Sequence, residues 1–103
     1  MKLKIKILSE SEIKEKLKEL PGWEYKNGRL IKTFKLKSFM DVIYLVDRLA
    51  PFFEELDHHA DMEIEHRKIM FKLWRFDIGM KVTNYDFLVA EKIEAISKQF
   101  PKA

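Results

Sequence analysis

Hydrophobic residues recur at helical spacing near the start of the chain. Ser9 and Glu12 have the spacing of a capping box, in which each side chain bonds a backbone N–H of the other residue. Pro21-Gly22 ends the pattern. The apolar positions between these signals are Ile13, Leu17 and Leu20. The pattern therefore predicts a first helix between Ser9 and Pro21.

A hairpin is predicted directly after this helix. Asn27-Gly28 tolerates positive φ and is the strongest short signal for a tight turn between antiparallel strands. Residues 23–25 precede the dipeptide, and the alternating stretch from Leu30 to Leu36 follows it. Two antiparallel strands are expected here.

A long apolar stripe predicts a second helix. Ser38 and Asp41 have the spacing of a helix start. The positions that share one helical face are Phe39, Val42, Ile43, Val46, Leu49 and Phe53. Pro51 lies inside this pattern, lacks an N–H and crowds the carbonyl of Asp47. We therefore expect a kink, or a break and restart, just before residues 54–59.

The rest of the chain repeats the arrangement of a strand pair and a helix. Residues 63–65 and 69–73 alternate in polarity, which predicts two strands joined near Arg67, with the odd positions of the pair facing the core. Thr83 and Asp86 form another helix cap. The inward positions of this last helix are Phe87, Ala90, Ile93, Ile96 and Phe100.

The predicted order of elements is α-β-β-α-β-β-α. Strand pairs and helices in this order are typical of an α+β fold, with a four-stranded antiparallel sheet and helices packed on one face. The length of 103 residues and the hydrophobic content of 47% fit one compact domain, residues 1–103.

Charge and cysteine content narrow the class of protein. Lys and Arg number 20 and Asp and Glu 17, and the charges are interspersed, so the net charge of +3 does not indicate a nucleic-acid partner. The absence of Cys excludes disulfides and thiolate metal sites and favours a cytoplasmic location. No apolar run reaches the roughly 18 residues of a membrane span. Few glycines and many Lys, Glu and Ile residues would suit a heat-adapted protein.

The candidate chemistry lies at two adjacent histidines, His58 and His59. Glu54 precedes His58 by four residues, and Glu55 precedes His59 by the same spacing. Each pair would share one face of the second helix, provided that the helix reaches this far. A carboxylate beside an imidazole favours the charged ring, which suits a group that exchanges protons. The pattern indicates acid/base chemistry without a nucleophile.

Simpler interpretations of the same residues stay open. One histidine could cap the second helix while the other faces solvent. Adjacent residues of an extended chain point to opposite sides, so no metal site is predicted, even with His66 as a third imidazole. Asp86 could be an ordinary helix cap.

Two aromatic residues near the end of the fourth strand are also candidates. Trp74 and Phe76 are predicted to share one strand face. They could be surface aromatics, part of an oligomer interface, or one wall of a pocket for a flat heterocycle.

The chain resembles the pterin-4a-carbinolamine dehydratase family from about Leu8 to Phe100. The motifs that carry the resemblance are Pro21-Gly22-Trp23, Leu30-Ile31-Lys32-Thr33-Phe34 leading to Phe39, Glu54-x-x-x-His58-His59, and Thr83-x-x-Asp86. The resemblance implies a cytoplasmic lyase that removes water from 4a-hydroxytetrahydropterin and gives the quinonoid dihydropterin. It also implies a small-molecule pterin substrate, a homodimer or homotetramer, and no metal or organic cofactor.

The resemblance assigns roles to the residues singled out above. By match of position, His58 and His59 would be the pair that protonates the departing hydroxyl and takes a proton from the ring nitrogen. Glu54 would orient or polarise His58, and Asp86 would lie at the edge of the pocket. The substrate-binding residues would be Asp57, His58, His59, Trp74, Arg75, Phe76 and Asp77.

The chain departs from the family pattern at three places. Ala60 stands where the family usually has proline, and His66 stands where it usually has an aromatic residue. A third active-site histidine is expected near the end of the fourth strand, where residues 74–79 read Trp-Arg-Phe-Asp-Ile-Gly with one residue inserted. Phe76 aligns with that histidine when counted from the histidine pair, and Asp77 when counted back from the last helix.

Two side chains could hold that side of a pterin instead. Asp77 could bond the N–H groups of the ring, and Trp74 could stack on it. The main alternative is a catalytically weakened pterin-binding or oligomeric interaction module of the same fold, since animal relatives act as dimerisation cofactors of a homeodomain transcription factor. A nucleic-acid binder is supported only by the basic charge balance and is not expected.

Overall fold

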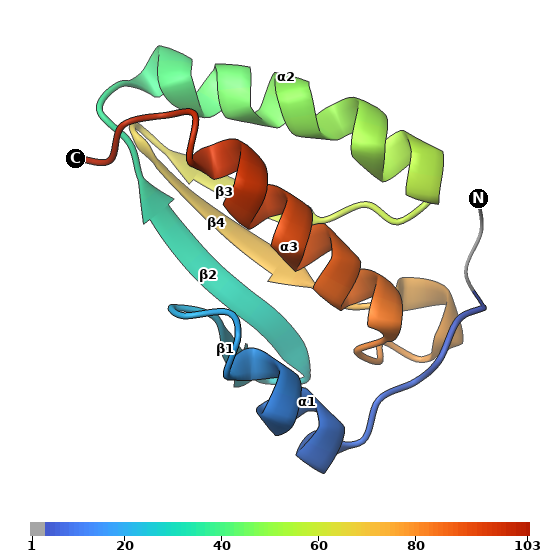
Figure 1. Cartoon of the computed structure of the whole chain (residues 1–103). Coiled ribbons are helices and arrows are strands. Elements are labelled where there is room, and N and C mark those ends of the chain that lie inside the picture. Colours follow the sequence, from blue (N-terminus) through green and yellow to red (C-terminus); the bar gives the residue numbers. More distant parts are fainter. Residues whose placement is uncertain (1–3) are drawn as a thin grey trace.

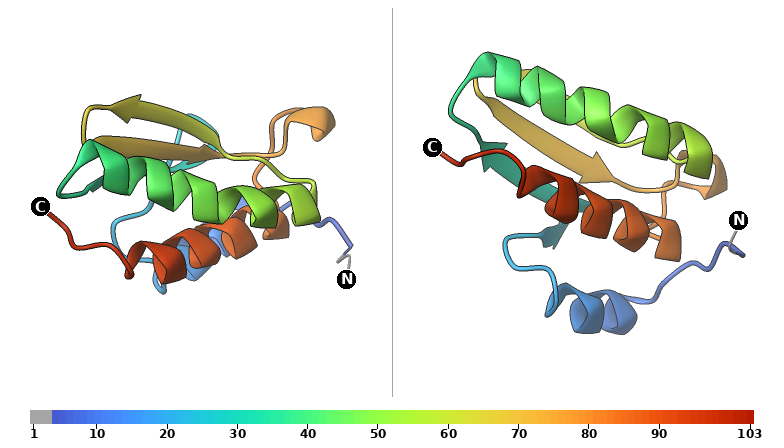
Figure 2. Two further views of the ribbon diagram at one scale, coloured as in Figure 1. Left: turned by 90° about the horizontal axis from the view of Figure 1, so that it is seen from above. Right: turned by 45° about the horizontal axis from the view of Figure 1, so that its top comes forward.

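Four antiparallel strands form one sheet in the order β1-β2-β4-β3 in this computed structural model, and the helices lie on one face of the sheet (Figures 1 and 2). The structure describes residues 4–103, so residues 1–3 of the predicted 1–103 domain lie outside the described residues. The elements are α1 (Glu10–Leu17), β1 (Glu24–Lys26), β2 (Arg29–Lys35), α2 (Phe39–Leu56), β3 (Asp61–Glu65), β4 (Lys68–Leu73), the short 3-10 helix η1 (Phe76–Ile78) and α3 (Asn84–Ser97). The predicted α+β fold and order of elements are confirmed.

The local signals in the sequence form the structures that they predict. Ser9 with Glu12, and Thr83 with Asp86, each make a complete capping box at the start of α1 and α3. Asn27 and Gly28 adopt φ values of 55° and 77°, which is the geometry of a tight hairpin turn. Side-chain capping therefore sets where these helices begin, and backbone preference sets where the hairpin turns.

The core lies between the sheet and the helices. β4 buries Ile69, Phe71 and Leu73, as the odd-position pattern predicts for that strand. The same pattern fails for β3, because Met62 pairs with Phe71 and Ile64 with Ile69, so the even positions of this exposed edge strand lie on the core side. α2 buries Val42, Leu45, Leu49 and Phe53. Phe39 was expected in this stripe, but it lies in the first turn, ahead of the buried positions, and is 46% exposed.

α2 continues through Pro51, so of the two predicted outcomes the break and restart is wrong, whereas the kink stays a prediction. Proline removes one backbone hydrogen bond from a helix. Leu49 and Phe53, on either side of Pro51, are 0% and 2% exposed. Their packing against the core compensates for the lost bond and carries the helix to Leu56.

The chain after β4 does not continue as a strand, which corrects the prediction for Trp74 and Phe76. β4 ends at Leu73, and Arg75 pairs with Lys81 as an isolated antiparallel bridge that closes a loop containing η1. Phe76 lies in η1 and is 78% exposed. The two aromatics therefore do not share a strand face.

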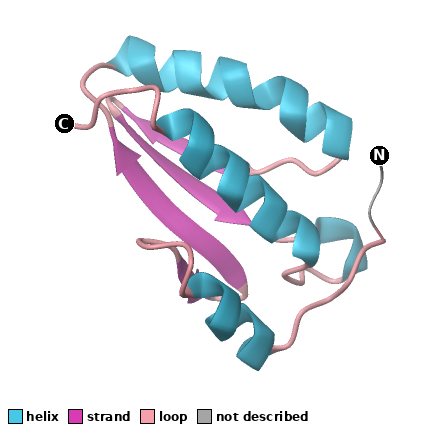
Figure 3. Cartoon of the chain, in the orientation of Figure 1, coloured by secondary structure: helices cyan, strands magenta, loops and turns pink. Residues whose placement is uncertain are grey.

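Three segments that are distant in sequence meet at one end of the sheet. Figure 3 shows the loop after α2, the loop after β4 and the beginning of α3 at this end. The hydrogen bonds described below link all three segments. Within residues 4–103, no helix has the length and apolar character that crossing a membrane requires.

Candidate active site

Helix α2 ends just before the two histidines. Asp57 adopts a left-handed conformation, with φ 50° and ψ 47°. The N–H of Asp57 donates to the Glu54 carbonyl and the N–H of His58 to the Phe53 carbonyl, both at 3.1 Å. This is the Schellman arrangement, in which a left-handed residue closes a helix. His58 and His59 therefore lie beyond the helix, and the four-residue spacing no longer decides their partners.

His58 is buried and paired with Asp86. Its Nε2 lies 2.5 Å from Asp86 Oδ1, and the side chains are 3% and 0% exposed. The other oxygen of Asp86 accepts the backbone N–H of Thr83 at 2.8 Å. This corrects two expectations, because the carboxylate that bonds His58 is that of Asp86 and not that of Glu54, and Asp86 is buried beneath His58 instead of lying at the edge of the pocket. The cause is the turn at Asp57, which sends His58 inward to the start of α3.

His59 is exposed and paired with Glu54. Its Nε2 lies 2.5 Å from Glu54 Oε1, and the side chains are 54% and 75% exposed. The expected pairing of His59 with Glu55 is therefore wrong, again because His59 has left the helix. Each imidazole has its own carboxylate, but one pair is inside the protein and the other faces solvent.

Arg75 is a member of this site whose contacts sequence reasoning missed. Its Nη1 donates to the Asp57 carbonyl at 3.0 Å and lies 3.1 Å from His58 Nδ1. Its Nε donates to Asp77 Oδ1 at 2.9 Å. The guanidinium thus joins the loop after α2 to the loop after β4.

A hollow of about 220 Å³ opens in front of these groups. Its lining residues are Asp57, His58, His59, Trp74, Arg75, Phe76 and Asp77. The structure thus brings together around one hollow the residues named as substrate-binding, while Glu54 and Asp86 support the two imidazoles from outside this lining.

One wall of the hollow is aromatic. The Trp74 Nε1–H donates to Asp61 Oδ2 at 3.2 Å. The guanidinium of Arg29 lies 4.9 Å from the Trp74 ring centroid. These two contacts orient the ring, and the face that Arg29 does not cover suits a flat heterocycle.

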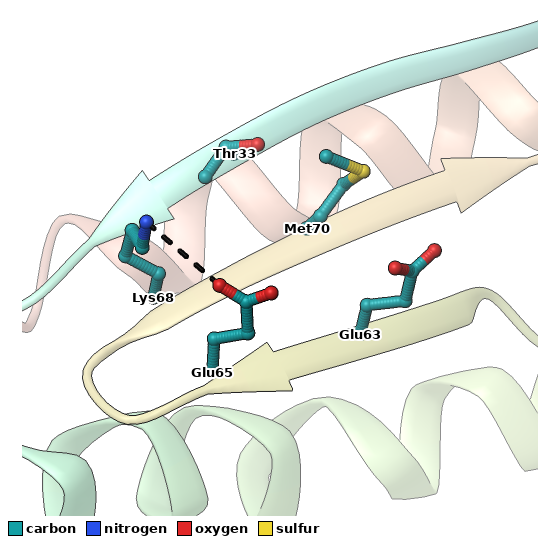
Figure 4. Close-up of a pocket in the computed structure, with 5 residues that line it drawn as sticks. All are labelled: Thr33, Glu63, Glu65, Lys68 and Met70. Atoms are coloured by element: carbon teal, nitrogen blue, oxygen red, sulfur yellow. Dashed lines mark ion pairs between the residues drawn. The ribbon is translucent and has the colours of Figure 1, made fainter.

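A second hollow, of about 140 Å³, lies on the open face of the sheet (Figure 4). Its lining residues are Thr33, Glu63, Glu65, Lys68 and Met70. Glu65 pairs with Lys68 at 3.9 Å and Glu63 pairs with Lys72, so its carboxylates are already matched with ammonium groups. The hollow at the histidines carries the acid/base groups and is the candidate site. Within residues 4–103, no three His, Cys, Asp or Glu side chains gather in a way that could hold a metal ion.

Comparison with known proteins points to one family. The family model for pterin 4 alpha carbinolamine dehydratase matches residues 6–96. A relative from Sulfolobus acidocaldarius is 39% identical over 89 residues, which are 86% of this chain and 97% of that protein. One from Aquifex aeolicus is 32% identical over 98 residues, which are 95% and 98% of the two chains. The name of both relatives is pterin-4-alpha-carbinolamine dehydratase, and in both cases this assignment is provisional.

A solved structure agrees with this result. The crystal structure of a transcriptional coactivator/pterin dehydratase from Brucella melitensis superposes with a TM-score of 0.82 at 31% sequence identity. The match covers 88% of this chain and 98% of that one. Sequence and fold thus agree over most of the chain.

Proposed function

Because the chain belongs to the pterin 4 alpha carbinolamine dehydratase family, we propose that it is a hydro-lyase that removes water from 4a-hydroxytetrahydropterin and releases the quinonoid dihydropterin. The observation that carries the proposal is the pair of imidazoles at one hollow, each bonded to a carboxylate. Acid/base groups at a concave site with an aromatic wall are what this reaction needs.

The reaction moves two protons and no electrons between protein and substrate. The 4a hydroxyl gains a proton and leaves as water, the ring nitrogen at position 5 loses a proton, and a double bond forms between that nitrogen and carbon 4a. The lone pair of the ring nitrogen assists the departure. No metal or organic cofactor is needed for these steps, and we propose none.

His59 is the group best placed to exchange these protons. It is half exposed, lines the hollow and has its Nε2 held by Glu54. The protonated ring would give a proton to the hydroxyl and, once neutral, take the proton from the ring nitrogen. Glu54 stabilises the charged form of the ring and orients it. One imidazole can therefore return to its starting state within a single turnover.

The remaining residues would hold the substrate. Trp74 offers a face for stacking, and the carboxylates of Asp57 and Asp77 can accept hydrogen bonds from the N–H groups of a pterin. His58, bonded to Asp86 below, forms part of the floor of the hollow. In this proposal, positioning and charge supply the binding, while His59 supplies the chemistry.

We also propose that the chain works in the cytoplasm as a homodimer or homotetramer. β3 is an edge strand, and its Met62 and Ile64 are 37% and 40% exposed. An edge strand with exposed apolar residues favours pairing across a twofold axis. Sedimentation analysis of the purified chain tests this, and a strict monomer would contradict it.

The test of the proposed activity is turnover of 4a-hydroxytetrahydropterin. His59→Gln should lower kcat by about 10²- to 10⁴-fold, the usual contribution of general acid/base catalysis. His66→Asn is the matched control, because His66 lies in the exposed turn between β3 and β4 and should not affect the rate. Wild-type turnover no faster than that of His59→Gln would refute the proposed activity. Binding of a pterin without turnover would favour the pterin-binding module instead.

A further inference from the structure

We propose that Arg75 is a positioning residue that fixes the ring of His58 as the neutral tautomer with its hydrogen on Nε2. The assignment follows from the contacts of the two side chains. Its consequence for turnover rests on the proposed function.

Arg75 is held firmly enough to have such an effect. Its side chain is 13% exposed, and its acceptors are the Asp57 carbonyl, His58 Nδ1 and the carboxylate of Asp77. The guanidinium also lies 5.8 Å from the centroid of the Tyr85 ring. These contacts come from three segments of the chain, so the guanidinium has little freedom to turn away from His58.

The chemistry of arginine decides which ring nitrogen carries the hydrogen. A guanidinium has only N–H donors, so His58 Nδ1, 3.1 Å away, must be the acceptor. The hydrogen of the neutral ring is therefore on Nε2, where it is donated to Asp86 Oδ1 at 2.5 Å. The other oxygen of Asp86 is occupied by the N–H of Thr83. Arg75, His58, Asp86 and Thr83 thus form a row of three hydrogen bonds in which each N–H faces an acceptor.

A proton added to His58 Nδ1 would break this row. Its N–H would point at an N–H of Arg75, and two positive charges would lie side by side in a buried place. Asp86 alone would favour the charged ring, and Asp57 adds a carboxylate next to it in the chain. Arg75 opposes both, although Asp77 offsets part of its charge. From α3, Tyr85 meets the His58 ring edge to face at 5.9 Å. Arg75 is therefore the group that keeps Nδ1 free of a proton.

As a consequence, the two histidines have different roles: His58 is held in place, and His59 is available to exchange protons. Both ring nitrogens of His58 are engaged, and the side chain is 3% exposed. His59 is exposed, and within residues 4–103 only its Nε2 has a hydrogen-bonding partner, which is Glu54. In addition, a neutral His58 places no positive charge beside His59, which must itself become positive during turnover.

Isotope-edited NMR of the ring nitrogens in the full-length chain tests the assignment directly, because the two tautomers and the charged ring have different nitrogen shifts. Signals are assigned with His58→Gln, His59→Gln and His66→Asn. Wild-type His58 should show a bare Nδ1 and a protonated Nε2 across roughly pH 6 to pH 8, the range in which histidine normally titrates. Arg75→Met should let Nδ1 take up a proton as the pH falls through this range, and Arg75→Lys, which keeps the charge, should restore part of the wild-type pattern.

Arg48→Met is the matched control. Arg48 also lies over an aromatic ring, that of Phe100, and donates one hydrogen bond, to Gln99, but it does not contact the site. Its removal should leave the His58 signals as in the wild type. A wild-type His58 with a hydrogen on Nδ1, or an Arg75→Met variant with unchanged His58 signals, would overturn the inference.

The activity assay separates this inference from the proposed function. If the proposed function holds, Arg75→Met should lower kcat by about tenfold, with the larger loss at the acidic end of the range. A wild-type chain without turnover but with the expected His58 signals would refute only the activity. Turnover with a proton on His58 Nδ1 would refute only the role of Arg75.

Discussion

His58 donates its Nε2 hydrogen to Asp86 at 2.5 Å, and this bond ties the loop after α2 to the first turn of α3. The two residues are 28 positions apart in the sequence, and both are buried. The same carboxylate closes the capping box of α3. A group that caps a helix and holds an active-site ring couples the stability of the fold to the geometry of the site.

Asp86→Asn should therefore weaken both the fold and the site. Asparagine offers one acceptor oxygen and an NH2 group, so either the Thr83 N–H or the His58 Nε2–H would face another donor. We expect a loss of about 1 to 3 kcal/mol in the free energy of unfolding, the cost of a buried donor without a partner. Urea denaturation measures it. Asp41→Asn, in the first turn of α2 and without a capping box, should cost less than about 1 kcal/mol. An equal loss of unfolding free energy in Asp86→Asn and Asp41→Asn would contradict the coupling between the stability of the fold and the geometry of the site.

Glu54→Gln should reduce activity without reducing stability. Glu54 is 75% exposed, so its removal should change the free energy of unfolding by less than about 0.5 kcal/mol. Glutamine no longer stabilises a charged His59, and kcat should fall by about tenfold. Steady-state kinetics measure the loss. Glu55→Gln is the control, because Glu55 is also exposed but His59 bonds Glu54. A rate unaffected by Glu54→Gln would show that this carboxylate does not support His59.

Glu12 should give the fold an acid-sensitive contribution at the start of α1. Hydrogen bonds from the Lys6 side chain and then from the backbone of Ser9 lower the pKa of Glu12 from 4.5 to about 2. Because the folded pKa lies below the unfolded one, the stabilisation is complete above about pH 4.5 and is lost as the pH falls towards 2. Glu12→Gln keeps the spacing of a capping box but removes the charge. The stability difference between wild type and variant should thus be largest near neutral pH and vanish at the acidic end.

Urea denaturation at a series of pH values checks this prediction. Glu10→Gln is the control, since it removes a charge from the same turn but leaves the pair of Lys6 and Glu12 in place. A stability difference for Glu12→Gln that stays constant with pH would show that the pKa of Glu12 is not lowered in the fold.

Most of the fold could be predicted because it follows from signals within a few residues. Ser9 with Glu12 and Thr83 with Asp86 mark helix starts through contacts three residues apart. Asn27-Gly28 marks the hairpin through its backbone preference alone. Such contacts depend little on the rest of the molecule, so these helix starts and the hairpin can be predicted from the sequence.

The partners of the two histidines could not be predicted in the same way. Asp57 ends α2 in a left-handed conformation, a place where glycine is the usual signal. Helical spacing suggested that Glu54 would bond His58. Because of the turn at Asp57, Glu54 bonds His59 instead, and His58 bonds Asp86. The left-handed residue at the end of α2 was therefore enough to change the partner of each histidine.

The role of Arg75 depends on contacts across the fold. Arg75 and His58 are 17 positions apart in the sequence. Arg75 lies beyond the end of β4, where it pairs with Lys81 across the loop that contains η1. The aromatic residues on either side suggested a continuing strand, which would have directed these side chains differently. No local sequence pattern predicts the contact between Arg75 and His58.

The most direct test of the account is a crystal structure of the chain with a bound dihydropterin. We predict that the ring occupies the hollow between His59 and the segment from Trp74 to Asp77, with His58 forming its floor and still bonded to Asp86. A ring bound elsewhere, such as on the open face of the sheet beside Thr33 and Met70, would contradict the account.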